Sequence, residues 1–344
     1  SPFSAIALVT TSENAEVVIE YGEEDAFDFS TPTVSTTAGD GIEILVLGLK
    51  ADRLYNLRVK QTSGGEETFS ESLPFNTDPL PDDWTLCNTS FFVDESEFDK
   101  EEVICTNGGW YSDNRKMYFC FDRWGETVWA LEHTDGVTML AVEAMTDGRW
   151  TSVGHSHSLL ALFDERSEHI RDFWPFFFED KTTFQHDWID GHETMELTEG
   201  PWAGAVGFIT GTADLVAPGL ILHGNGIIVL DPDNETVLWD WLAHGELGDE
   251  EPIDPTIPYD RVTLDEFEED WQHANAIDHG LDSDGGQFFW MSLRSQDWII
   301  KIDVETDEVV WRLGYQGDFE LVDDLDSPKP VPLPWHKWMY HQHA

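Results

Sequence analysis

The chain has 344 residues and a formal net charge of −51, with 69 acidic residues against 18 lysines and arginines. Aromatic residues make up 13% of the sequence, so the chain can build a substantial hydrophobic core and is not intrinsically disordered. The acidic excess is therefore a property of the folded surface. Its negative field argues against nucleic acid and anionic lipid as partners.

Other bulk features describe the setting in which the protein works. No apolar run reaches the roughly 20 residues that a membrane-spanning helix needs. Scarce lysine in so acidic a chain resembles adaptation to high salt, and we expect a halophilic or marine source. The sequence begins at Ser1 without Met. We expect a processed, secreted protein, extracellular or periplasmic.

The cysteines Cys87, Cys105 and Cys120 fit no zinc-binding spacing. A disulfide between Cys87 and Cys105 and buried free thiols both fit the pattern.

Residues 1–78 are predicted to form a β-sandwich of the fibronectin III or immunoglobulin type. Five short segments alternate apolar and polar residues between turns: 4–11, 15–22, 41–49, 55–62 and 67–75. "LGLKADRLYNLRV" resembles the tyrosine corner of such domains, with Tyr55 folding back onto the backbone. The Pro- and Asp-rich stretch "FNTDPLPDDW" then indicates a linker, and a second domain is expected over residues 79–344.

The second domain repeats one pattern. In residues 121–131, 230–241 and 302–314 an apolar strand ends in Asp, a polar turn follows, and the next strand carries Val and Trp; residues 163–173 are a degenerate copy. Such strand–turn–strand units predict the blades of a β-propeller, each burying its Trp between neighbouring sheets. "LDEFEEDWQHA" is the best helix candidate in an otherwise all-β chain.

The last residues, "WHKWMYHQHA", resemble the opening strand of a further blade. An unpaired blade would expose a sheet edge, which folded proteins avoid. The sequence therefore predicts an incomplete propeller: either the chain is truncated, or another polypeptide, which includes a homo-oligomeric copy, completes it.

Several polar residues lie outside the turns, near predicted inner strands whose ends converge on a propeller's central channel. They are His186, His192, His273, Asn275, Arg294, His341 and His343. A lone His in a strand is more often a hydrogen-bonded filler than a functional group, and His155 and His157 are assigned to a loop or outer strand. A metal centre of several histidines is one alternative. Arg294 favours an anion instead, because guanidinium binds sulfate, phosphate or carboxylate in a forked geometry.

These motifs resemble the bacterial aryl sulfotransferase family. The resemblance covers nearly the whole chain and is most specific from residue 270 to 314, with "DWQHANAID", then "SLRSQDWIIKID" and "VVWRLG". It implies a β-sandwich followed by a six-bladed propeller. It also implies sulfuryl transfer between phenols without a nucleotide donor, a metal or any other cofactor.

The resemblance also implies roles for individual residues. The family's transferring histidine lies in a Gln-His motif and corresponds to His343, with His341 as a neighbouring alternative. The His-x-Asn motif corresponds to His273 and Asn275, and the arginine to Arg294. An earlier pocket histidine corresponds to His192, and His186 competes for that position.

The implied mechanism is ping-pong. An imidazole nitrogen of His343 attacks the sulfur of an aryl sulfate, giving a sulfo-histidine and a phenol, and a phenol acceptor then takes the sulfuryl group. His192, His273, Asn275 and Arg294 would bind the sulfuryl oxygens. The partners are therefore a small phenolic sulfate donor and a phenol acceptor.

Two alternatives come from other functional classes. A non-catalytic extracellular propeller, used in binding or adhesion, would keep the fold without turnover. A hydrolase of sulfate or phosphate esters would need clustered Asp and His ligands around its site, whereas the acids here are dispersed. The Asp-rich turns "DPDN" and "DSDGG" lack the EF-hand spacing and are expected to be solvated.

Overall fold

The computed structural model describes residues 2–24, 26–81, 103–109, 116–132, 139–154, 159–164, 168–178, 181–182, 186–217, 220–243, 263–265, 268–314, 317–320 and 342. These residues form β-strands joined by turns, with two short 3-10 helices, η2 (Pro175–Phe177) and η3 (Arg294–Gln296). The all-β prediction is confirmed. In the part of the chain described, no helix is long and apolar enough to cross a membrane.

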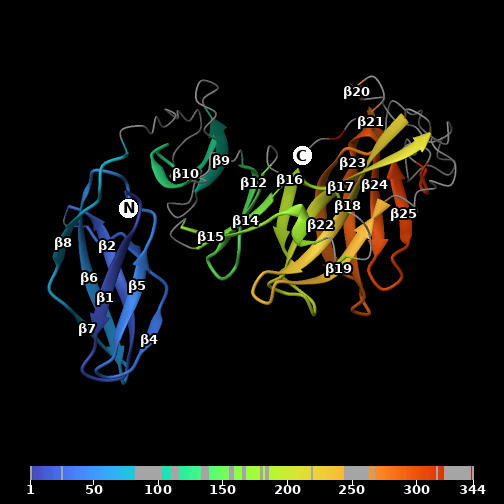
Figure 1. The fold of residues 1–344 in the computed structure, drawn as a ribbon. Helices are drawn as coiled ribbons and strands as arrows, with labels where there is room; N and C mark the ends of the chain where they lie inside the picture. The colour runs from blue at the N-terminus through green and yellow to red at the C-terminus, as the bar shows by residue number, and fades with distance from the viewer. Residues whose placement is uncertain are drawn as a thin grey trace, which may run out of the picture. The chain divides into compact units, whose positions relative to one another are not determined.

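The chain divides into two compact units, Ser1–Glu132 and His133–Ala344. The first contains strands β1 to β11 and the second contains β12 to β25 (Figure 1). The predicted domain boundary after residue 78 falls between β8 and β9 within the first unit. It stays a prediction.

Strands β1 to β8 form two sheets around one core. Their bounds are β1 Ala5–Thr10, β2 Ala15–Glu23, β3 Phe29–Ser30, β4 Val34–Thr36, β5 Gly41–Val46, β6 Leu54–Ser63, β7 Glu66–Phe69 and β8 Leu73–Asn76. Strand β1 pairs with β5, while the other sheet runs β3-β2-β6-β7, with β4 on β2 and β8 on β6. Alternate residues Val17 and Ile19 of β2 pack against Val9 and Ile44 of the first sheet, as a sandwich requires.

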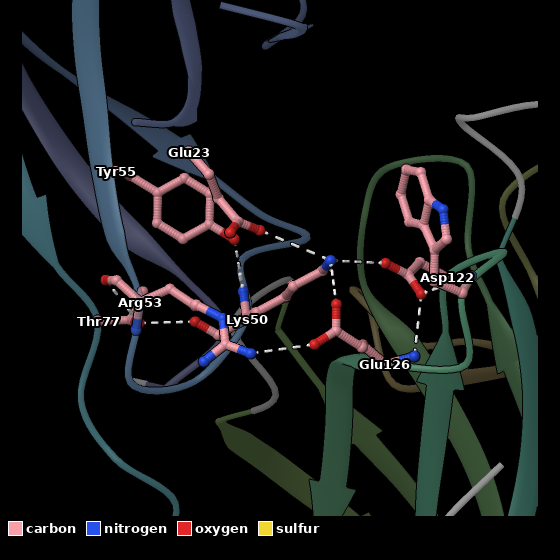
Figure 2. Close-up of polar contacts among 8 residues, drawn as sticks. Glu23, Lys50, Arg53, Tyr55, Thr77, Asp122 and Glu126 are labelled. Carbon is pink, nitrogen blue, oxygen red and sulfur yellow. Dashed lines mark hydrogen bonds and ion pairs between the residues drawn. The ribbon is translucent and has the colours of Figure 1, made fainter. Parts of the chain in front are cut away.

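The tyrosine corner is confirmed. Tyr55 is buried, and its Oη accepts a hydrogen bond from the Lys50 backbone N–H at 2.9 Å (Figure 2). The ring thereby fills the core while the phenol oxygen satisfies a main-chain donor in the connection that precedes β6.

Strands β9 (Ile104–Gly109), β10 (Lys116–Phe121) and β11 (Thr127–Glu132) form a three-stranded antiparallel sheet. Cys105 lies directly opposite Cys120 in the β9–β10 register, with their Cα atoms 4.0 Å apart, and the two form a disulfide. Neither alternative considered from the sequence is therefore right for Cys105: it pairs with Cys120 and not with Cys87, and it is not a free thiol, because strand register decides which thiols meet. Cys87 lies outside the described residues.

The second unit is built of sheets in which four consecutive strands pair antiparallel, the arrangement of propeller blades. One sheet contains β12 Met139–Ala144, β13 Trp150–Gly154, β14 Leu159–Phe163 and β15 His169–Phe173. The next contains β16 Trp188–Glu196, β17 Val206–Ala217, β18 Leu220–Asp231 and β19 Thr236–Leu242. The last contains β22 Ala274–Leu281, β23 Gln287–Leu293, β24 Trp298–Asp303 and β25 Val309–Gly314.

Neighbouring sheets of this unit stack face to face. Along β18, Ile228 and Leu230 join a hydrophobic cluster with Leu160 of β14, whereas Ile227 and Val229 join a different cluster with Phe289 of β23. Successive side chains of a strand point to opposite faces, so the middle sheet is covered on both sides. Trp241 of β19 is fully buried in the second of these clusters, as predicted for the tryptophan of a repeat.

The predicted helix at residues 264–274 is wrong. Strands β20 (Thr263–Asp265) and β21 (Glu268–Asp270) lie there, and β21 pairs in parallel with β18 at residues 221–223. A single short helix is marginal in water. Pairing with the long strand β18 satisfies the backbone of this segment instead.

The four predicted repeats are all hairpins: β10–β11, β14–β15, β18–β19 and β24–β25. The Asp recurs at the same place in each repeat because its carboxylate accepts hydrogen bonds from backbone N–H groups of the turn. Asp303 Oδ1 accepts from Glu305 at 3.0 Å and Thr306 at 2.8 Å. Asp122, Asp164 and Asp231 accept backbone N–H groups in the same way. The hydrogen bond from the Thr306 N–H holds the pKa of Asp303 below its ordinary value.

We expect Asp303→Ala to lower the free energy of unfolding by about 1 kcal/mol, the usual cost of losing a side chain that caps backbone N–H groups. Asp303→Asn should lose less, since its amide oxygen still accepts. Urea unfolding measures both. The control is Asp284→Ala: Asp284 is exposed in the β22–β23 turn and its carboxylate makes no hydrogen bond to a described residue. Equal losses at 303 and 284 would contradict the role of the turn carboxylate.

Candidate active site

A bulge in β16 carries the first polar residues of the site. Ile189 pairs with Thr210 of β17 and Thr194 pairs with Phe208, so residues 190–193 leave the ladder opposite a single β17 residue. Bulges redirect side chains and are common beside active sites. His192 is presented by this bulge and does not follow the alternation of the strand.

Asp190 holds His192 in place. The Nδ1–H of His192 donates to Asp190 Oδ1 at 2.5 Å, and the backbone N–H of His192 reaches the same oxygen at 3.1 Å. The hydrogen bond to Asp190 raises the pKa of His192 above its ordinary value, although burial acts in the opposite direction. His192 therefore stays protonated to a higher pH than a histidine without a carboxylate partner.

His273 lies next to His192. Its backbone has φ of 50°, a left-handed conformation that is uncommon for a residue with a side chain. Its Nδ1 is hydrogen bonded to the Asp270 carboxylate. The ring centroids of His192 and His273 are 4.9 Å apart, with planes inclined at 63°. Two imidazoles, each hydrogen bonded to its own aspartate, thus meet although they are 81 positions apart in the sequence.

Asn225 of β18 links the elements that carry the two histidines. Its Oδ1 accepts from the Ala274 backbone N–H at 3.0 Å, and its Nδ2 donates to Thr210 O at 3.2 Å and to Asp190 Oδ2 at 3.4 Å. Its own backbone N–H donates to Gln272 Oε1. A buried amide with this many partners fixes the positions of β16, β18 and β22 relative to one another.

Arg294 begins η3 beside His273. The Arg294 N–H donates to His273 O at 3.2 Å, and the Ser295 N–H donates to Gln272 O at 3.1 Å. The guanidinium is half-buried and makes no hydrogen bond or ion pair with any described residue. Carboxylates pair with most other described cations: Lys50, Arg53, Arg58, Lys60, Arg149, Arg171, Lys301 and Arg312. Among the described residues, Arg294 therefore differs from most other cations in having no carboxylate partner.

Asn275 occupies a second bulge, where the β22–β23 register shifts between Ala274 and Ala276. It is 2% exposed, and its Nδ2 donates to the backbone carbonyl of Gln342 at 2.7 Å. The Gln342 side chain donates in turn to Leu293 O at 3.3 Å and Trp298 O at 2.8 Å. The Gln of the Gln-His motif is thus bound at the same place as the His-x-Asn motif.

The other predicted site residues fall in different places. His186 is buried, with Thr210 Oγ1 at 2.6 Å from its Nδ1 and Asp240 Oδ2 at 3.4 Å from its Nε2. Of the two competing histidines, the structure brings His192, not His186, against His273. His341 and His343 lie outside the described residues, as do His155 and His157, so their assignments stay predictions.

Sequence reasoning missed the residues that orient the site: Asp190, Asn225, Asp270 and the anchoring role of Gln342. Nothing in the sequence separates Asp190 and Asp270 from 69 acidic residues, most of which are expected at the surface. Glu193, also in the β16 bulge, was missed as well. Burial, followed by the nearby charge of Glu143, raises the pKa of Glu193 to about 7.

A cavity of about 970 Å³ lies in the first unit, lined by aromatic residues such as Tyr21, Phe29 and Trp124. Lys50 reaches into it, but carboxylates surround its Nζ: Asp122 at 3.1 Å, Glu23 at 3.6 Å, and Glu126 in a short contact (Figure 2). Burial by itself would lower the pKa of Lys50, and the hydrogen bonds to Glu126 and Asp122 raise it overall. We interpret Lys50 as an internal tie between the sandwich and the β10–β11 hairpin, not as a catalytic amine.

Two solved structures show a distant likeness to the chain. "YCF48 bound to D1 peptide" aligns with a TM-score of 0.30 and 10% identity, over 92% of this chain and 86% of that one. "Kuenenia stuttgartiensis Hydrazine Synthase" aligns with a TM-score of 0.29 and 9% identity, over 76% of this chain and 83% of that one. Likenesses at this level carry no argument about function. None of the curated proteins compared with the chain matches it significantly.

The comparison with protein families is decisive. The family profile described as "Arylsulfotransferase (ASST)" matches residues 82–344, which span the whole second unit and every residue of the site described above. The chain belongs to the arylsulfotransferase family.

Proposed function

We propose that this protein moves a sulfuryl group from a phenolic sulfate ester to a phenol through a sulfo-histidine formed on His343. Family membership supports aryl sulfotransferase activity in general. The observation that carries the finer proposal is Arg294, a half-buried cation with no carboxylate partner among the described residues, beside two histidines in a chain of net charge −51. That combination suits an anion of small size.

The sulfuryl group has three oxygens, and the site offers donors of matching kind. Arg294 supplies the permanent positive charge. His192, whose pKa Asp190 raises, supplies a second donor that is cationic when protonated. His273 lies against His192 and contributes the third donor, an imidazole or imidazolium N–H. Donors held in fixed positions stabilise the charge on the sulfuryl oxygens as the bonds to sulfur change.

The first half-reaction exchanges one bond to sulfur for another. A neutral imidazole nitrogen of His343 attacks the sulfur; the N–S bond forms and the S–O bond to the aryl group breaks, so the electron pair leaves with the phenolate. Phenol has a pKa near 10, like that of Tyr, so phenolate is a good leaving group. It takes a proton from solvent or from a protonated histidine of the site.

The second half-reaction reverses these changes with a different phenol. The acceptor oxygen loses its proton to a base, attacks the sulfur and releases the imidazole of His343. A covalent intermediate of this kind produces ping-pong kinetics. The residues of this chain bind, orient and exchange protons throughout, and the proposal requires no nucleotide donor.

We also propose that the protein is exported. The Cys105–Cys120 disulfide supports this, because disulfides persist in oxidising compartments and are rare in the cytosol.

We expect His343→Ala to abolish release of a chromogenic phenol from its sulfate ester in the presence of an acceptor phenol. Mass spectrometry of wild-type protein exposed to donor alone should find a sulfuryl group on the peptide that contains His343. His169→Ala is the matched control, since His169 lies on the exposed strand β15. Its activity should equal that of the wild type.

Two results would overturn the proposal. Folded wild-type protein that releases no phenol in high or low salt would leave a non-catalytic binding propeller. A sulfuryl group found on His341, with full activity in His343→Ala, would move the nucleophile by two positions.

The pKa of His192 leads to a pH prediction. Because Asp190 raises that pKa, protonated His192 persists to higher pH, and activity that depends on it declines only as the pH rises through the raised value. Asp190→Asn removes the carboxylate and lets the pKa fall toward its ordinary value. The alkaline limb of the kcat/KM profile should therefore move to lower pH.

The matched control for this prediction is Asp172→Asn, which changes another aspartate paired with a histidine, His169, with 2.8 Å between Nε2 and Oδ1. This variant should leave the alkaline limb where it is in the wild type. An unchanged limb in Asp190→Asn would show that protonated His192 takes no part in the reaction.

A further inference from the structure

Gln342 is anchored by three hydrogen bonds to residues distant in sequence. Its Nε2 donates to Trp298 O at 2.8 Å and Leu293 O at 3.3 Å, and its backbone carbonyl accepts from Asn275 Nδ2 at 2.7 Å. Both amide hydrogens and the main-chain carbonyl are thereby used. Side chain and backbone of one residue are held at once, which restricts both its position and its orientation.

The two carbonyls belong to the rigid frame of the site. Leu293 ends β23 and Trp298 begins β24, and the two residues pair with each other across the ladder. Both are buried, and the turn between them is η3, which carries Arg294. Gln342 therefore binds across the base of the loop that presents the arginine. Its anchors cannot move without disturbing a well-packed sheet.

The hydrogen bond from Asn275 to Gln342 bears on whether Asn275 could also bind the substrate. Asn275 is almost completely buried, and its donor group is already directed at Gln342 O. The Nδ2 group has a second hydrogen, but with 2% of the residue exposed the amide presents almost no surface to a substrate. Turning it outward would deprive the Gln342 carbonyl of this donor, which costs about 1–3 kcal/mol for a buried group. The geometry favours Asn275 as a positioning residue over Asn275 as a ligand of the substrate.

We propose that Gln342 and Asn275 form a latch that positions the residue after Gln342, His343, for attack on sulfur. Consecutive Cα atoms are separated by about 3.8 Å, so a fixed Gln342 backbone determines where the next residue begins. A misplacement of about 1 Å costs on the order of 100-fold in rate. The role of His343 rests on the proposed function; the latch itself rests on the three hydrogen bonds.

Kinetics test the latch with two uncharged changes of similar size, Gln342→Met and Asn275→Leu, each of which removes a donor aimed at a carbonyl. Each should lower kcat by about 10- to 100-fold, because the nucleophile is less well placed. KM for the aryl sulfate should change less than about threefold, because no contact with the substrate is lost. Since both changes release the same residue, the double variant should be within about threefold of the worse single variant.

Gln61→Met is the matched control: among the described residues the Gln61 side chain makes one long hydrogen bond, 3.4 Å to Glu13, on the sandwich. It should leave kcat and KM unchanged, and thermal melts should show that all variants are folded. A rise in KM for Asn275→Leu with kcat unchanged would show that Asn275 binds the substrate and would overturn the latch. Losses that multiply in the double variant would overturn it as well.

Hydrogen exchange tests the latch without any reference to turnover. The peptide that contains Gln342 should exchange roughly tenfold faster in both variants than in the wild type and in Gln61→Met. Unchanged exchange would overturn the latch even if the protein transfers sulfuryl groups. Faster exchange in a protein whose wild type shows no turnover would support the latch and overturn the proposed function.

Discussion

The amide side chain of Asn225 is the contact on which the arrangement of the candidate site depends. Main-chain hydrogen bonds join strands within a sheet but do not join sheets stacked face to face, so side chains must do so. Asn225 accepts from Ala274 of the next sheet and donates to Thr210 and Asp190 of its own. Through Asp190 it affects the orientation of His192, and through Ala274 it holds the residue after His273. One buried amide therefore determines how the two imidazoles meet.

The backbone around this amide is irregular in a way that sheets normally avoid. Residues 190–193 leave the β16–β17 ladder, Asn275 lies at a register shift, and His273 adopts a left-handed conformation. Each departure costs free energy, about 1–3 kcal/mol for a strained residue. The fully buried clusters on both faces of the middle sheet offset that cost. Similar irregularities occur elsewhere in the described chain, but these three lie together at the candidate site.

Many charged side chains of the described residues have a clear partner. The acidic excess is partly used locally, since Asp122, Asp164, Asp231 and Asp303 each accept backbone N–H groups in a hairpin turn. Most described lysines and arginines are paired with carboxylates, so they leave little positive charge elsewhere. Arg294 differs from these cations, because its backbone N–H donates to His273 O while its guanidinium makes no ion pair with a carboxylate of the described residues. The proposed anion-binding function rests on this contrast within a strongly negative protein.

Much of the architecture could be predicted because it depends on residues that are close together in the sequence. The Asp, polar turn, Val and Trp pattern recurs within about a dozen residues, and the alternation of β2 predicted its buried face without reference to the rest of the chain. Tyr55 was predictable for the same reason, since its partner Lys50 is five positions away. The helix predicted at residues 264–274 failed because β18, about 45 residues earlier, offers a pairing edge that no local pattern records.

The residues of the candidate site, too, could be predicted only in part from the sequence. Sequence motifs identified His273, Asn275 and Arg294, because the residues are close along the chain and unusual in so acidic a composition. The sequence by itself therefore determined the all-β class and the repeating hairpins, and it singled out these three residues as candidates for the site. Only the tertiary structure decided which cysteines pair, that His192 meets His273, and that Asp190, Asp270 and Asn225 orient them. It also decided that Asn275 bonds to Gln342, because each of these outcomes depends on strand register and on the stacking of sheets between residues far apart in the chain.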